Sequence, residues 1–75
     1  MQQKLINKKD LDKVKEYLPN IEQEFDLDDI DELQIAIMVA IDKTFINDSE
    51  PTDETYVLED IYDRVSAMYK KLQNV

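Results

Sequence analysis

Apolar residues recur with a helical period along most of the chain, and the pattern is densest between residues 26 and 46. At about 100° per residue, one broad apolar face of this stretch contains Ile30, Leu33, Ile37, Met38, Ala40, Ile41 and Phe45. A second, narrower stripe on the other side contains Ile35, Val39 and Ile46. The pattern predicts a helix over residues 28–46. Because this helix is apolar on two sides, it must be central in a bundle or must contact a partner.

A further helix is predicted on each side of this stretch. The spacing 3-4-3-4 predicts a helix over residues 8–25, with the apolar positions Leu11, Val14, Leu18, Ile21 and Phe25. Pro19 should kink or break it, because proline lacks the amide hydrogen and crowds the carbonyl four residues earlier. The third helix is predicted over residues 53–74, with the apolar positions Leu58, Ile61, Val65, Met68, Leu72 and Val75.

The predicted fold is all-α, a small three-helix bundle in which the helix over residues 28–46 is central. The 75 residues suffice for a single domain, in which residues 1–7 form a lead-in to the first helix. The absence of glycine argues against an all-β fold, whose tight turns usually need residues at positive φ. An apolar content of 43% is too high for a disordered chain, even with a net charge of −9.

The narrow stripe of Ile35, Val39 and Ile46 has no obvious cover within a three-helix bundle. Three explanations are open. The stripe is ordinary core covered by another segment, such as Leu5 and Ile6, or it forms a homodimer interface, or it binds a different partner. A change of Val39 to glutamate should separate core from interface, because a charge buried without a partner costs several kcal/mol.

Acidic residues dominate the middle of the chain, where residues 16–63 carry sixteen acids against Lys43 alone. Seven of them fall within eleven residues: Glu22, Glu24, Asp26, Asp28, Asp29, Asp31 and Glu32. Carboxylates in the first turn of a helix favour its dipole, which explains part of this cluster. The alternative is that the cluster binds a basic protein surface. An acidic middle also disfavours contact with nucleic acid or an anionic membrane.

The composition removes most catalytic chemistry. Without histidine or cysteine, the chain has no imidazole base, no thiolate nucleophile and no metal site built on those ligands. Calcium loops of the EF-hand type that start at Asp26 or Asp48 fail, since Asp31 or Asp53 then replaces the turning glycine. A loose surface calcium site stays open. We therefore expect no enzyme, no cofactor and no dedicated metal site.

These observations favour a protein-binding role. We expect a small acidic binding module, of the type of an inhibitor or immunity factor, that masks a basic surface on a partner protein. Tyr56 lies opposite the apolar stripe of the third helix and should be exposed for such contacts. One alternative is a structural or regulatory homodimer whose acids only keep it soluble, and another is a nucleic-acid mimic.

The cellular setting follows only from general features of the chain. The amino terminus lacks the apolar segment of a secretory signal, and the longest apolar run is seven residues. We therefore expect a cytoplasmic protein that does not contact the membrane. The isoleucine- and lysine-containing, glycine-free composition suits a small bacterial, plasmid or phage protein.

Overall fold

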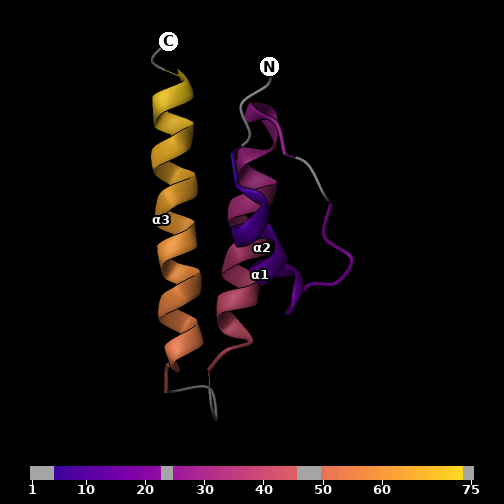
Figure 1. Ribbon diagram of the computed structural model, residues 1–75, viewed down its shortest axis with the longest axis vertical. Helices are drawn as coiled ribbons and strands as arrows, with labels where there is room; N and C mark the ends of the chain where they lie inside the picture. The colour runs from indigo at the N-terminus through magenta and orange to yellow at the C-terminus, as the bar shows by residue number, and fades with distance from the viewer. Residues whose placement is uncertain (1–4, 23–24, 46–49, 74–75) are drawn as a thin grey trace.

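The described part of the chain, residues 5–22, 25–45 and 50–73 of a computed structural model, is helical, as predicted. Its elements are α1 (Lys8–Lys15), the short 3-10 helix η1 (Leu27–Asp29), α2 (Ile30–Asp42) and α3 (Asp53–Gln73). Helices α2 and α3 form an antiparallel hairpin, and α1 packs across one side of it (Figure 1). The prediction of a small all-α, three-helix bundle is confirmed. No described helix has the length and apolar character needed to cross a membrane.

Helix α1 is shorter than predicted. Asn7 caps its start, where the side-chain Oδ1 accepts a hydrogen bond of 2.8 Å from the amide of Asp10. The helix ends at Lys15 instead of continuing to residue 25. Lys15 is the residue whose carbonyl the ring of Pro19 would crowd, and the chain leaves the helix there. The helix is thus broken before Pro19, and the prediction of a helix over residues 8–25 is wrong in its second half.

The apolar residues beyond the break still pack against the core. Leu18 and Ile21 are half-buried and Phe25 is buried, although none of them is helical. Their regular spacing therefore reflects contact with the core from an irregular segment. This segment returns along the bundle to the start of α2 (Figure 1).

Helix α2 begins later and ends earlier than predicted. Asp26 and Asp29 form a capping box at the start of η1, in which Asp29 Oδ2 accepts a hydrogen bond of 3.0 Å from the amide of Asp26. One 3-10 turn follows before α2 proper. At the other end, α2 stops at Asp42, and the Thr44 hydroxyl donates to the Ile41 carbonyl at 2.6 Å. The predicted end at residue 46 lies outside the described residues, as does residue 74 at the end of the third helix.

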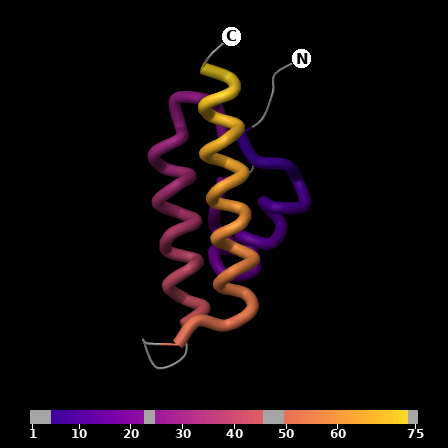
Figure 2. Tube along the Cα trace, turned by 90° about the vertical axis from the view of Figure 1, so that its left-hand side faces the viewer, coloured from indigo at the N-terminus to yellow at the C-terminus, as the bar shows by residue number. Residues whose placement is uncertain are grey.

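The core lies where the three helices meet. Buried apolar side chains come from every part of the described chain: Leu5, Ile6, Leu11, Val14, Phe25, Ile30, Leu33, Ile37, Ala40, Leu58, Ile61 and Val65. Burial of a leucine or isoleucine side chain contributes about 1.5 to 3 kcal/mol relative to exposure, so this cluster is the main source of stability. Figure 2 shows α1 on one side of α3 and α2 on the other. No described element covers the side of the hairpin that faces away from α1.

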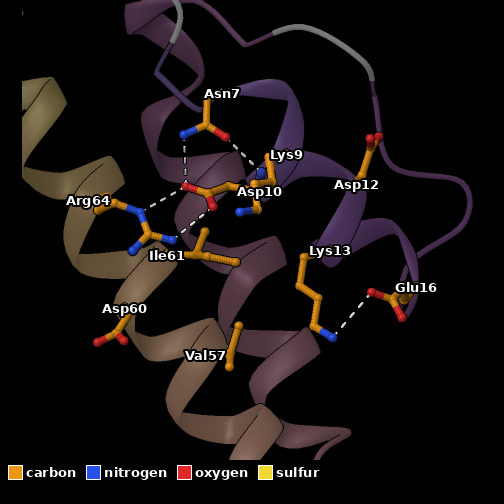
Figure 3. A pocket seen from close by; sticks show the side chains of 10 residues that line it. All are labelled: Asn7, Lys9, Asp10, Asp12, Lys13, Glu16, Val57, Asp60, Ile61 and Arg64. Atoms are coloured by element: carbon orange, nitrogen blue, oxygen red, sulfur yellow. Dashed lines mark hydrogen bonds and ion pairs between the residues drawn. The ribbon is translucent and has the colours of Figure 1, made fainter.

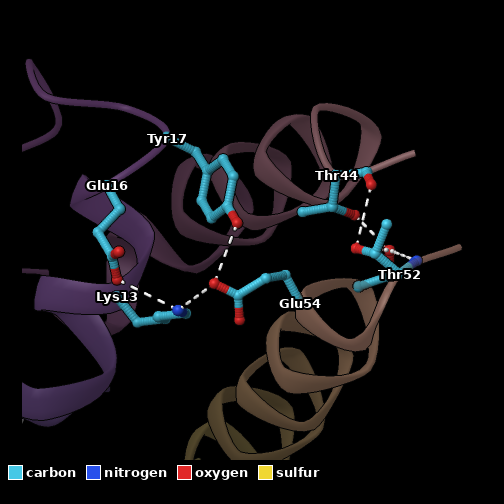
Figure 4. Close-up of polar contacts among 7 residues, drawn as sticks. Lys13, Glu16, Tyr17, Thr44, Thr52 and Glu54 are labelled. Carbon is cyan, nitrogen blue, oxygen red and sulfur yellow. Dashed lines mark hydrogen bonds and ion pairs between the residues drawn. The ribbon is translucent and has the colours of Figure 1, made fainter. Parts of the chain in front are cut away.

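Three threonines hold the hairpin together at the end of α2 and the start of α3. The Thr52 hydroxyl donates to the Thr44 carbonyl at 3.1 Å, and the Thr44 and Thr55 hydroxyls are hydrogen-bonded to each other (Figure 4). The amide of Thr52 donates to Thr55 Oγ1 at 2.9 Å. These bonds connect carbonyls and amides at the two helix ends that have no partner within a helix. They fix the register of α2 against α3 and so position everything on the open side of the hairpin.

Candidate functional site

The stripe predicted on the outer side of α2 is exposed. Ile35 is 60% exposed and Val39 is 41% exposed, so the explanation that these two residues are ordinary core is wrong. Met38, predicted on the core face, is also exposed and lies between them on the helix. Ile46 lies outside the described residues. We use the name open face for the surface formed by Ile35, Met38 and Val39 of α2 with the neighbouring α3 residues Glu59, Tyr62 and Asp63.

Leu5 and Ile6 do not cover the open face. Both are buried, and they line a hollow together with Arg64, Val65 and Met68 of α3. The segment before α1 thus lies against the carboxyl-terminal half of α3. The proposed cover by Leu5 and Ile6 is therefore wrong, because the core draws both side chains to another part of the surface.

A groove runs between α2 and α3 along the open face. Its volume is about 290 Å³, and it is lined by Met38, Ile41, Glu59, Tyr62 and Asp63. We call it the α2–α3 groove. Closer to the start of α2, the side-chain amide of Gln34 donates a hydrogen bond of 3.1 Å to the Ser66 hydroxyl and so connects the two helices. Tyr56 is exposed, as predicted, and lies one turn before Glu59 on the same side of α3.

The described acids of the cluster over residues 22–32 are exposed, except for Asp29. Asp29 is half-buried and serves as a cap for η1, which is the structural explanation for that residue. Asp31 and Glu32 are exposed in the first turn of α2, four and three residues before Ile35, so helical spacing places them beside the open face. The exposed residues Glu22, Asp26 and Asp28 precede α2, and Glu24 lies outside the described residues. Helical spacing thus places two acids of the predicted cluster, Asp31 and Glu32, beside the exposed stripe.

The side of α3 that faces α1 carries a larger hollow of about 820 Å³, and several of the charged side chains that line it are bonded to one another (Figure 3). The carboxylate of Asp10, which is buried, accepts hydrogen bonds of 2.9 and 2.8 Å from Nε and Nη2 of Arg64. Asn7 Nδ2 donates to the same carboxylate at 3.2 Å. The hydrogen bond to Asp10 raises the pKa of Arg64 above its usual value. A bidentate pair of this kind fixes α1 against α3.

A second polar group on this side joins α1 to the start of α3. Lys13 Nζ forms an ion pair with Glu54, and the Tyr17 hydroxyl donates to Glu54 Oε1 at 3.3 Å (Figure 4). The bond to Glu54 raises the pKa of Lys13, and the bond from Lys13 lowers the pKa of Glu54. Partial burial, with the nearby charge of Glu54, raises the pKa of Tyr17. These charges are neutralised within the chain, so this side has a structural role.

The described residues offer little to a small ligand. Among them, no group of three histidine, cysteine, aspartate or glutamate side chains is arranged to hold a metal ion. Each buried side-chain nitrogen or oxygen in the same residues has a hydrogen-bond partner. A built ligand site usually directs a few polar groups into an apolar pocket. The distinctive surface is instead apolar and exposed, with acids at its edges.

Sequence reasoning missed several residues of the open face, namely Met38, Ile41, Glu59, Tyr62 and Asp63. One signal for Met38 was present, because Ile35, Met38, Val39 and Asp42 follow the spacing 3-1-3 that places residues on one side of a helix. The residues of α3 could not be found in this way. Their position depends on the register between two helices, which the threonine bonds set.

In comparisons with protein-family models, curated proteins and solved structures, the chain matched none of them. The geometry and charge of the open face are therefore the guide to function.

Proposed function

We propose that this protein is a binding module that masks a basic surface of a partner protein through its open face. The observation that carries the proposal is the exposure of three large apolar side chains, Ile35, Met38 and Val39, side by side on one helix. Contiguous apolar surface on a small protein usually marks an interaction site. One role that fits is that of an inhibitor or immunity-type factor, which acts by covering the partner. This role needs binding alone and no catalytic group.

The charge around the stripe favours a basic partner. Exposed acids border it on both helices: Asp31, Glu32 and Asp42 on α2, and Glu59 and Asp63 on α3. In the described part of the chain, none of these five carboxylates takes part in an ion pair. A surface with lysine or arginine at its rim and apolar groups at its centre would complement this arrangement. Such complementarity raises the association rate and excludes acidic competitors.

The same acids disfavour the alternative of a homodimer through this face. In a two-fold dimer, the patch of one copy faces the same patch of the other. The acids that border the patch of one copy would then face those of the other copy, and like charges at an interface are costly. The alternative of a nucleic-acid mimic needs a continuous acidic surface, whereas Ile35, Met38 and Val39 interrupt the acids with apolar groups.

The test is capture from an extract of the native host, with wild-type protein and two variants as baits. Val39→Glu places a charge in the open face. Val57→Glu is the matched control, because Val57 is also 41% exposed but lines the hollow beside α1. We expect wild type and Val57→Glu to retain the same basic protein, identified by mass spectrometry and released by high salt, and Val39→Glu to lose it. Melting curves confirm that all three baits are folded.

Two results would contradict the proposal. Equal retention by all three baits would show that the open face is not the binding surface. A wild-type protein that is dimeric in solution by light scattering, and that becomes monomeric on Val39→Glu, would show that the face binds a second copy instead.

A further inference from the structure

The α2–α3 groove is bounded by two rows of side chains. The row on α2 follows the spacing 4-3-4 and consists of Asp31, Ile35, Met38 and Asp42. The row on α3 follows the spacing 3-4 and consists of Tyr56, Glu59 and Asp63. Residues at these spacings lie along one side of a helix, so each row runs close to the helix axis. Ile41 and Tyr62 are half-buried between the rows. The groove itself is lined by Met38, Ile41, Glu59, Tyr62 and Asp63, and the two rows continue past it with acids on both helices.

The row of side chains on α2, which extends beyond the groove at both ends, is as long as a short helix. From Asp31 to Asp42, α2 rises by roughly 16 Å at about 1.5 Å per residue. A helix of about three turns has the same length. An amphipathic helix laid in an apolar groove is a common mode of peptide recognition, in which side chains three and four residues apart act as anchors.

Helix α1 shows how a helix is bound on the other side of the same hairpin. It places Leu11 and Val14, three residues apart, in the core. Between them, Lys13 reaches across to form an ion pair with Glu54 of α3. A short apolar stripe, an adjacent lysine and the Asp10–Arg64 pair thus hold a helix of eight residues against α3 within this chain. The open face also combines exposed apolar side chains with acids, Glu59 and Asp63 in place of Glu54, and no described helix lies on it.

We propose that the groove binds an amphipathic helix of the partner, about three turns long, with apolar residues at 3-4 spacing and lysine or arginine beside them. This inference rests on the proposed function and specifies the form of the partner. The apolar row of the helix packs on Met38, Ile41 and Tyr62. Its cations face Glu59 and Asp63 on one edge and Asp31 and Asp42 on the other.

The probe is a synthetic peptide of about 18 residues made of leucine, lysine and alanine, with the leucines on one side of the helix. A second peptide of equal composition has its leucines spread around the helix. Binding is followed by the methyl resonances of Met38, which lines the groove, and of Met68, which lines the hollow near Leu5. We expect the patterned peptide to shift the Met38 methyl, to leave Met68 in place and to gain helical circular dichroism. The scrambled peptide should bind at least tenfold more weakly.

Two double variants separate the groove from the overall acidity of the chain. Glu59→Gln with Asp63→Asn removes two charges at the groove and should weaken the patterned peptide about tenfold. Asp12→Asn with Glu22→Gln removes two exposed charges elsewhere and should leave the affinity within about twofold. All four positions are exposed, so neither double variant should unfold the protein, and a melting curve checks this.

The other possible outcomes overturn this inference alone or both proposals. If both peptides bind equally and shift Met38, the open face binds basic chains but not as a helix, which overturns this inference and leaves the proposed function. If both double variants bind equally and Met38 does not move, the binding is only long-range attraction, and both proposals fail. Absence of binding by either peptide overturns this inference, and the host-extract experiment then decides the proposed function. A Met38 shift that depends on protein concentration alone identifies a second copy as the occupant.

Discussion

The two sides of the α2–α3 hairpin differ in how their charges and apolar groups are used. On the α1 side, Asp10 is bonded to Arg64 and Glu54 to Lys13, and the apolar residues of α1 are buried. On the open face, large apolar side chains are exposed, and the described chain provides no cation for the acids of the groove. On the α1 side, charges of opposite sign thus join α1 to α3, whereas the acids beside the open face have no ion pair among the described residues. We therefore assign function to the open face, where the described chain provides no partner for the exposed apolar side chains and the acids.

The largest expected effect tests whether the side of α2 that contains Ile37 belongs to the core. Ile37 is fully buried, and Ile37→Ala should lower the free energy of unfolding by about 2 to 5 kcal/mol through lost burial and a new cavity. Urea unfolding followed by circular dichroism measures this change. Since a domain of this size has little stability to lose, Ile37→Val is the second variant, with an expected loss of about 0.5 to 1.5 kcal/mol. A loss below 0.5 kcal/mol for Ile37→Ala would contradict the assignment of this side to the core.

Much of this contrast was predictable from the sequence. Helical periodicity alone separates Ile37 from Ile35 and Val39, because residues on one face of a helix are three or four positions apart. The all-α bundle and the central place of α2 follow from the same pattern. The end of α1 at Lys15 was harder to predict, since Leu18, Ile21 and Phe25 keep the helical spacing beyond it. Here the local effect of Pro19 prevailed over the apolar pattern.

The α1 side and the groove needed the structure. The pair of Asp10 and Arg64 joins residues 54 positions apart, and no local pattern indicates it. The helical wheel placed Met38 on the core face. A wheel gives the direction of each side chain, but not the width of the surface that the neighbouring helices cover.

The second prediction concerns the α1 side. Arg64→Met keeps much of the apolar stem but leaves the buried carboxylate of Asp10 with Asn7 as its remaining side-chain donor among the described residues. We expect a loss of about 1 to 2 kcal/mol, at the low end for bonds to charged groups because the Arg64 side chain is half-exposed. Lys71→Met removes an exposed charge from the same helix and should change stability by under about 0.5 kcal/mol. Equal effects of the two variants in urea unfolding would show that the Asp10–Arg64 pair does not stabilise the fold.

The third prediction uses pH to compare one acid from each side. The bond from Lys13 lowers the pKa of Glu54 below its usual value of 4.5. A carboxylate with a lowered folded-state pKa stabilises the fold above its unfolded-state pKa, and this contribution is lost as pH falls through the folded-state value. Glu54→Gln should therefore lower the melting temperature at pH 7, and by progressively less as pH falls below 4.5. Glu59→Gln should not lower it at pH 7, because Glu59 has no ion pair within the described chain. Parallel pH profiles for the two variants would contradict the difference between the two sides.

The smallest expected effect completes the comparison within α2. Ile35→Ala is the same substitution as Ile37→Ala, two residues away, but Ile35 is 60% exposed. The loss of its partly buried side chain is offset by the higher helix propensity of alanine, so the net change should lie within about 0.5 kcal/mol. The variant should also bind the patterned peptide more weakly, because the apolar row of α2 loses a member. Urea unfolding and the Met38 methyl titration measure the two quantities on one sample. A large loss of stability with unchanged binding would place Ile35 in the structural part of the molecule and remove it from the open face.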